Sequence, residues 1–204
     1  MRAAQTSLSL LAVLLLVLIA GTAAAEVRVV EPAELPPFEL RDHAGRSFTR
    51  DSLKGQWDLI LLGFTHCPDV CPFVLSNLVQ VREEMSLRVS PDNLPRVVFV
   101  AVDPQRDEAM LADYVGYFHP DFLGVTGAWE QIALFVEGVD GFARLGEPGP
   151  DGAYEVRHSA AVVVVAPDGR IHAEFLPPID PAAAAEYLAR KQLAYRRGSA
   201  EAAP

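Results

Sequence analysis

The sequence contains only two cysteines among its 204 residues, Cys67 and Cys71, and they lie four residues apart. A disulfide between positions this close would constrain almost none of the chain, which excludes a disulfide-stapled scaffold. Positive charge is also scarce, because 17 Lys and Arg residues stand against 27 Asp and Glu residues, giving a formal net charge of −10. This charge balance argues against nucleic acid or anionic lipid as a partner. The sequence shows no internal repeat.

The first 25 residues contain a single charge, Arg2. Residues 8–20 form a run of apolar and small side chains, and residues 23–25 offer an A-x-A cleavage site. These features predict a secretory signal peptide in residues 1–25. The segment is also long enough to span a bilayer if it is not cut, so an N-terminal membrane anchor at residues 8–25 is the alternative. In both cases the rest of the chain is expected to be exported, where a free dithiol needs a dedicated reductant.

Residues 26–196 are expected to form one domain, followed by a disordered tail at residues 197–204. Apolar segments that indicate strands alternate with segments of helical periodicity, and hairpin signals occur near both ends. This order predicts an α/β fold with a central mixed sheet flanked by helices and an N-terminal β-hairpin extension. The expected strands are 38–40, 46–49, 58–64, 97–102, 122–125, 160–166 and 170–175; the expected helices are 67–89, 108–118, 128–137 and 181–195; residues 138–152 are expected to be a loop.

The two cysteines lie where the expected strand 58–64 gives way to a helix. If that helix begins near Cys67, the cysteines share one helical face, with β-carbons about 5–6 Å apart. A helix N-terminus favours thiolate over thiol, and Pro68 and Pro72 suit a first turn or a bend. The pair is therefore interpreted as a reactive or metal-binding dithiol. A structural disulfide, or two thiols buried in the core, is the alternative.

Several other side chains receive structural interpretations. Asp107 and Thr126 are expected to cap the helices that follow them. Asp103, Arg106 and Asp107 are equally consistent with a docking surface and with a capped helix carrying a local ion pair. Three aromatic residues near these motifs are expected to lie in the core: Phe64, Phe73 and Phe118. Three histidines are expected in turns or at the surface: His43, His119 and His172. His66 is expected at most to support Cys67.

The segment Gly-Phe-Thr-His-Cys-Pro-Asp-Val-Cys-Pro at residues 63–72 resembles the signature of the Sco/SenC family. Further blocks are similar to other parts of that family: the Leu-Pro-x-Phe-x-Leu-x-Asp pattern at 35–42, Asp-Pro-Gln-Arg-Asp at 103–107, residues 118–127, and His-Ser-Ala at 158–160. The resemblance covers residues 35–175, and its first signature is highly specific.

The resemblance implies an exported or membrane-tethered copper-binding protein with a thioredoxin-like fold, which helps to assemble the CuA centre of cytochrome c oxidase. The implied copper ligands are Cys67, Cys71 and His158. Copper(I) is soft and accepts low coordination numbers, so two thiolates and an imidazole suit it, and copper(II) also tolerates this donor set. Zinc prefers four ligands. The family often has Asp directly before the histidine, and Arg157 occupies that position here.

The implied partners are the copper-binding subunit of cytochrome c oxidase, a copper donor and a thiol reductant, all in the bacterial periplasm. The alternative function is enzymatic: a thiol–disulfide oxidoreductase, or a peroxiredoxin-like peroxidase. His158 distinguishes these possibilities, because a pure reductase has no use for a third metal ligand. Thr65 stands only two residues before Cys67, which is a weak match to the peroxidase pattern.

Overall fold

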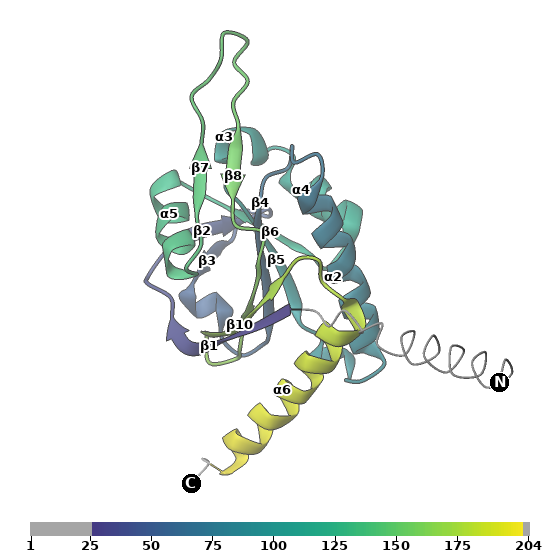
Figure 1. Ribbon diagram of the computed structural model, residues 1–204. Helices are drawn as coiled ribbons and strands as arrows, with labels where there is room; N and C mark the ends of the chain where they lie inside the picture. The colour runs from purple at the N-terminus through teal and green to yellow at the C-terminus, as the bar shows by residue number, and fades with distance from the viewer. Residues whose placement is uncertain (1–25, 202–204) are drawn as a thin grey trace, which may run out of the picture.

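A mixed eight-stranded sheet organises residues 26–201, the part of the chain that the computed structural model describes (Figure 1). Its strand order is β1-β10-β9-β4-β5-β6-β2-β3. The strands are β1 (Glu26–Glu34), β2 (Glu39–Asp42), β3 (Ser47–Thr49), β4 (Asp58–Gly63), β5 (Arg96–Ala101), β6 (Leu123–Thr126), β9 (Val162–Val165) and β10 (Arg170–Leu176).

The centre of the sheet is parallel and its margins are antiparallel. β4 pairs in parallel with β5, and β5 with β6, whereas β9 lies antiparallel on the other side of β4. All six residues of β4 and all four of β9 are buried, because helices or hairpins cover both faces of the sheet. The predicted mixed sheet with flanking helices is therefore confirmed.

Alternation along β4 divides the interior into two cores. Leu59 and Leu61 point into a core formed with α2, α4 and α6, and Ile60 and Leu62 point into a second core shared with α5 and the N-terminal hairpin. Successive side chains of a strand face opposite sides of its sheet, which explains this division. The helices are α2 (Val70–Ser86), α3 (Pro104–Asp107), α4 (Leu111–Phe118), α5 (Trp129–Gly138) and α6 (Pro181–Glu201), with short 3₁₀ helices at Arg50–Leu53 and Pro91–Asn93.

The N-terminal hairpin continues the main sheet. β2 pairs with β3 around a turn in which Gly45 has φ 79°, a backbone conformation that glycine adopts without strain. β2 also pairs antiparallel with β6, which fixes the hairpin at one edge of the sheet. β1 pairs with β10 at the other edge.

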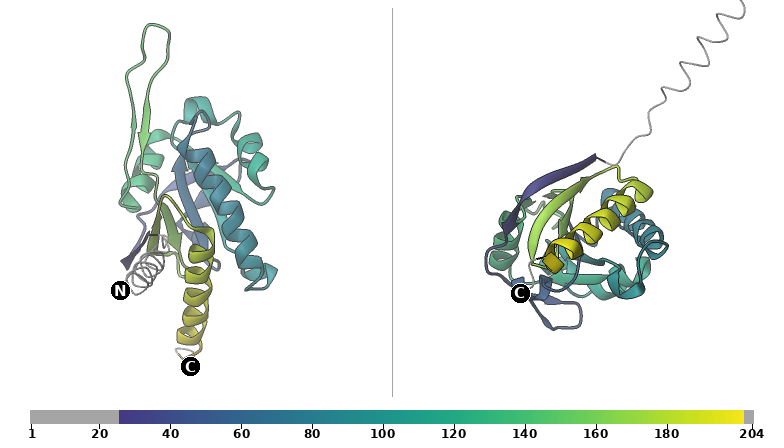
Figure 2. Two further views of the ribbon diagram at one scale, coloured as in Figure 1. Left: turned by 45° about the vertical axis from the view of Figure 1, so that its right-hand side comes forward. Right: turned by 90° about the horizontal axis from the view of Figure 1, so that it is seen from below.

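The structure differs from the predicted elements in several places, of which three concern the second half of the chain. The expected loop at 138–152 includes β7 (Ala143–Leu145), which pairs with β8 (Val156–His158) in a separate hairpin that projects from the domain (Figures 1 and 2). The expected helix 108–118 is shorter and is preceded by α3, because the chain turns at Met110. Finally, α6 continues to Glu201, so residues 197–201 are helical where a disordered tail was predicted. Alanine and arginine favour helix, which outweighs the cost of Gly198.

The predicted signal peptide or anchor in residues 1–25 lies outside the described residues. Among residues 26–201, no helix combines the length and the apolar character needed to cross a membrane.

Candidate metal centre

The dithiol loop, residues 64–71, begins where β4 ends and reaches the first turn of α2. Its position depends on Gly63, because a Cβ atom there would lie 2.3 Å from the Phe99 ring and 3.1 Å from the Cys71 Sγ. Cys71 is fully buried, whereas Cys67 is half-buried. The absence of a side chain at Gly63 thus lets one cysteine sit directly above the end of the central strand.

The helix begins three residues later than expected, at Val70, so Cys67 lies in the loop before it. Pro68 disfavours helical geometry at the residue before it, which explains the late start. The two sulfurs nevertheless remain close, because the Cys71 backbone N–H donates to the Cys67 Sγ over 3.4 Å. Both thiols are free rather than joined in a disulfide.

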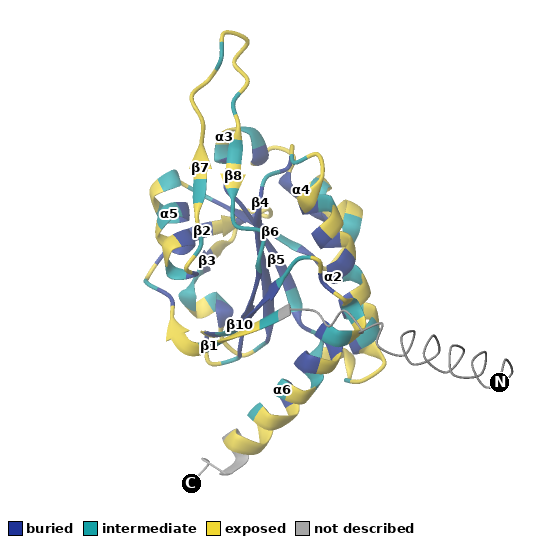
Figure 3. Cartoon of the chain, in the orientation of Figure 1, coloured by how far each residue is buried: buried dark blue, intermediate teal, exposed yellow. Residues whose placement is uncertain are grey.

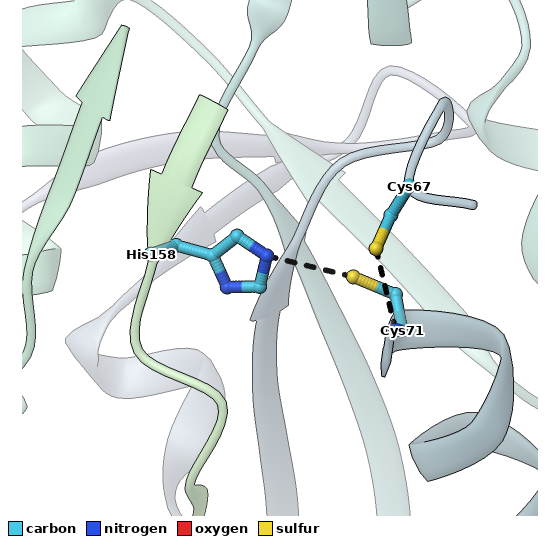
Figure 4. Close-up of side chains that lie close together, drawn as sticks. All are labelled: Cys67, Cys71 and His158. Atoms are coloured by element: carbon cyan, nitrogen blue, oxygen red, sulfur yellow. Dashed lines mark hydrogen bonds between the residues drawn. The ribbon is translucent and has the colours of Figure 1, made fainter. Parts of the chain in front are cut away.

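His158 ends β8 and points its ring toward the cysteines (Figure 4). Its Nε2 lies 3.5 Å from the Cys71 Sγ, although the two residues are 87 positions apart in the sequence. Its Nδ1 lies 2.9 Å from the Ser159 carbonyl oxygen, which can only accept a hydrogen bond, so the neutral ring carries its proton on Nδ1. This leaves the Nε2 lone pair directed at the thiol. The Phe64 ring packs edge-on against the imidazole at 5.8 Å.

Burial dominates the electrostatics of these side chains. It raises the pKa of the Cys71 thiol, and the neighbouring Cys67 adds to this effect. Burial of the Cys71 thiol therefore opposes the thiolate that a helix N-terminus was expected to favour. Burial also lowers the pKa of His158, and the bond to the Ser159 carbonyl opposes that shift. In the metal-free protein, burial therefore favours a protonated Cys71 thiol and a neutral imidazole.

Asp107 anchors the dithiol loop by accepting hydrogen bonds from Thr65, a role that was not predicted from the sequence. Its Oδ1 accepts hydrogen bonds from both the backbone N–H and the hydroxyl of Thr65, each 2.7 Å long, and its Oδ2 accepts one from the Asp103 N–H at 3.1 Å. The prediction that Asp107 caps the helix after it is thus incorrect. Burial raises the pKa of Asp107, while the three hydrogen bonds oppose that rise. The Asp-x-x-x-Asp spacing directly after a buried strand was the available signal.

The structure gives the remaining predicted residues mostly structural positions. Asp103 is buried and paired with Arg106, which supports the local ion pair over a docking surface. Thr126 donates to the Ala101 carbonyl and does not cap α5. Phe73, expected in the core, is 52% exposed, because it lies on the outer face of α2. The His66 Nδ1 lies 3.1 Å from the Thr65 hydroxyl oxygen.

The donor atoms of Cys67, Cys71 and His158 all lie within 4.8 Å of one another. Metal–sulfur bonds of about 2.3 Å and metal–nitrogen bonds of about 2.0 Å place pairs of ligand atoms at most about 4.6 Å apart, so a small adjustment closes the set around one ion. Two sulfurs and one imidazole nitrogen form a soft donor set. The arrangement can therefore hold a soft metal ion, and its partly exposed Cys67 and His158 leave a route for that ion to enter and leave.

The dithiol lies at the junction of the central strand β4 with helix α2, and His158 faces it from just before the antiparallel strand β9. This arrangement defines a thioredoxin-like domain with a Cys-Cys-His group. The family model described as SCO1/SenC matches residues 29–192, and the chain belongs to this family. The predicted family and its thioredoxin-like fold are thereby confirmed.

Relatives and solved structures agree with this assignment. The mouse protein named "Protein SCO2 homolog, mitochondrial" is 44% identical over 135 residues, which are 65% of this chain and 52% of that protein, so the chain spans about half the length of this relative. The "SCO2-like protein" of Rickettsia felis is 35% identical over 74% of this chain and 73% of its own length. The structure of Bradyrhizobium japonicum ScoI with copper bound superimposes with a TM-score of 0.68 at 34% identity, covering 78% of this chain and 99% of that one. Arabidopsis thaliana ScoI with copper bound gives a TM-score of 0.72 at 28% identity, covering 80% and 100%.

Proposed function

We propose that this protein is an exported copper-binding protein that holds copper(I) through Cys67, Cys71 and His158 and helps to assemble the CuA site of cytochrome c oxidase. The observation that carries the proposal is the 3.5 Å approach of the His158 Nε2 to the Cys71 Sγ. A redox dithiol does not require this imidazole, whereas a three-coordinate copper site does. The two related ScoI structures solved with copper bound support the choice of metal.

The environment of the three side chains suits a metal that is bound and later released. Copper(I) replaces the proton of the buried Cys71 thiol with a metal cation, so the thiolate is neutralised without water. No fourth His, Cys, Asp or Glu joins the group among residues 26–201, which favours copper(I) over zinc. Copper(II) is a second oxidation state that this donor set accepts.

The partners and the location follow from the same proposal. The copper acceptor is the copper-binding subunit of cytochrome c oxidase, and a copper donor and a thiol reductant act in the same compartment. That compartment is the bacterial periplasm, where residues 1–25 serve either as a cleaved signal peptide or, through residues 8–25, as an inner-membrane anchor. The net charge of −10 is unfavourable for binding nucleic acid.

A thiol–disulfide oxidoreductase is the second candidate, because the half-buried Cys67 lies next to Cys71 and can act as the attacking thiol. The peroxidase alternative is weaker. Thr65 stands only two residues before Cys67, and its hydroxyl donates to Asp107 and not to a cysteine sulfur.

Metal analysis of anaerobically reduced protein tests the copper proposal. We expect one copper(I) per chain, and loss of tight binding in Cys67→Ser, Cys71→Ser and His158→Ala. Protein whose cysteines have been oxidised to a disulfide is expected to take up no copper(I), because it offers no thiolate. If His158→Ala retains copper as tightly as the parent protein, the three-ligand site is wrong and the oxidoreductase becomes the better interpretation.

A further inference from the structure

The projecting hairpin that carries His158 is attached to the body of the protein through Tyr154. This residue lies in the connection between β7 and β8, four positions before the histidine. Its hydroxyl donates a hydrogen bond of 2.8 Å to the Asp103 Oδ1, and the Arg106 guanidinium lies over its ring, 3.9 Å from the centroid. Asp103 and Arg106 also form an ion pair with each other. A half-buried tyrosine is thus fastened to both ends of α3 by two different contacts.

The same short helix holds the dithiol loop. The Asp103 N–H donates to Asp107, and Asp107 accepts the two hydrogen bonds of Thr65, which stands two residues before Cys67. One polar network, anchored on the buried carboxylates of Asp103 and Asp107, therefore reaches both halves of the candidate metal centre.

The hairpin has few other hydrogen bonds to the body of the protein. β7 and β8 pair with each other over three residues, and neither strand joins the eight-stranded sheet. Within the described chain, two hydrogen bonds connect residues 143–158 to residues outside 142–159. One joins Tyr154 to Asp103, and the other joins His158 to Cys71. The side chain of Arg157, which precedes the histidine, is 72% exposed and lies 4.0 Å from the Glu155 carboxylate. Ala143 and Val156 also pack against the second core, and the Phe64 ring lies against the imidazole. Among the described residues, Tyr154 therefore supplies the one hydrogen bond from the body of the protein to this hairpin that the histidine does not make itself.

We propose that Tyr154 is a positioning residue that fixes His158 against the dithiol and thereby sets how tightly, and for how long, the protein holds copper. This inference rests on the proposed copper function. The hydrogen bond to Asp103 holds the hairpin closed, so that the imidazole reaches the metal without first paying the entropy of ordering a free loop. When that hydrogen bond is broken, the histidine can leave while both sulfurs remain in place.

A double-mutant cycle tests the inference. Tyr154→Phe keeps the ring that lies under Arg106 and removes the hydrogen bond to Asp103. We expect copper(I) affinity, measured by anaerobic competition with a chromophoric chelator, to fall about tenfold, the effect of one hydrogen bond, with a matching increase in the release rate. In the His158→Ala background, the same substitution is expected to have no effect on affinity. Tyr117→Phe is the matched control, because Tyr117 is 85% exposed on α4.

Two further measurements test whether the loss of copper affinity in Tyr154→Phe comes from a displaced His158. In the copper(II) form, Tyr154→Phe is expected to weaken the imidazole nitrogen coupling in the electron paramagnetic resonance spectrum. In the reduced metal-free protein, it is expected to move the ring proton resonances of His158 toward solvent-exposed values while the melting temperature stays close to that of Tyr117→Phe.

The outcomes separate this inference from the function on which it rests. Equal loss of affinity in the presence and absence of His158 would show that Tyr154 acts through the dithiol loop, and would overturn the positioning role. Unchanged affinity and unchanged His158 resonances in Tyr154→Phe would also overturn it, while leaving the copper site intact. Failure of the copper function itself is signalled separately, by parent-like copper binding in His158→Ala alone.

Discussion

The two halves of the candidate metal centre are built differently. The dithiol loop, residues 64–71, lies over the central parallel strands, with Cys71 fully buried and Thr65 bound twice to Asp107. The histidine is carried instead by the projecting hairpin, most of which is exposed along its length (Figure 3). We call residues 142–159 the histidine arm. One half of the site is part of the core, and the other half is fastened to it by a few side chains.

Because the two halves are built differently, we expect substitutions in one half to change mainly the stability of the fold and substitutions in the other to change mainly copper binding. Changes under the dithiol loop are expected to reduce the free energy of unfolding, because they disturb packed core atoms. Changes in the histidine arm are expected to leave that free energy nearly unchanged and to alter copper binding, because segments with few buried contacts open locally at low cost. The following predictions test this separation, beginning with the largest expected effect.

Gly63→Ala is expected to damage the dithiol half most severely. The new Cβ atom would lie 2.3 Å from Phe99 and 3.1 Å from the Cys71 sulfur, and the surrounding core leaves little room for either to move. We expect a loss of about 3 kcal/mol in the free energy of unfolding, measured by urea denaturation of the reduced protein.

Gly116→Ala is the matched control for this substitution. A Cβ atom at Gly116 in α4 meets no atom within 4 Å, so alanine is expected to stabilise the protein by about 0.5–1 kcal/mol through its helix propensity. Equal unfolding midpoints for the two variants would contradict the tight packing under Cys71.

Asp107→Asn is expected to have the next largest effect. The amide can offer an oxygen to Thr65, but its NH₂ group then faces the Asp103 N–H, so two donors oppose each other. We expect about 2 kcal/mol of destabilisation together with weaker copper binding, since the loop that carries Cys67 loses its support. Asp113→Asn, on the exposed side of α4, is the control and is expected to stay within about 0.5 kcal/mol of the parent protein. A fully stable Asp107→Asn variant would show that the network is dispensable.

The structure of the dithiol half could be predicted from the sequence, because the residues that indicate it are neighbours in the chain. The apolar strand, the prolines and the helical periodicity after Cys71 all lie within one continuous segment, so the strand–loop–helix could be predicted with an error of three residues at the helix start. That error has a local cause as well, since Pro68 delays the helix. The burial of Cys71, which raises its pKa, could not be predicted in this way, because it depends on how Phe99 and Gly63 pack.

The histidine half is non-local, and here sequence reasoning depended on family resemblance. No spacing rule connects His158 with a cysteine 87 residues away. The strands β7 and β8 have three residues each and carry too little alternation to be recognised. Residues 138–152 were therefore predicted to be a loop, and no strand was predicted at 156–158. Tyr154 was missed for the same reason, because a tyrosine in a loop gives no sign that its hydroxyl meets a buried carboxylate on another element.

Ser159→Ala is expected to affect the histidine arm alone. The Ser159 hydroxyl accepts a hydrogen bond of 2.9 Å from the Phe142 N–H, which closes the base of the arm. Its loss is expected to lower the free energy of local opening by about 1 kcal/mol, so that the amides of β7 and β8 exchange hydrogen several times faster by mass spectrometry. The urea midpoint and the exchange of β4 and β5 are expected to stay unchanged. Acceleration throughout the sheet would show that the arm is part of the cooperative core.

Asp42→Asn provides a reference outside both halves and has the smallest expected effect on the metal centre. Burial tends to raise the pKa of Asp42, but hydrogen bonds from the Arg46 and Ala44 N–H groups and the Arg46 guanidinium outweigh it, so the folded-state pKa lies below the ordinary value. The ionised carboxylate therefore contributes stability above the unfolded-state pKa of about 3.9, and this contribution is lost as the pH falls through the lower folded-state pKa. We expect Asn to cost about 1 kcal/mol at pH 6 and progressively less toward pH 2, in urea titrations at each pH, with copper affinity unchanged at neutral pH. A deficit that stays constant with pH would mean that the turn depends on the shape of the side chain and not on its charge.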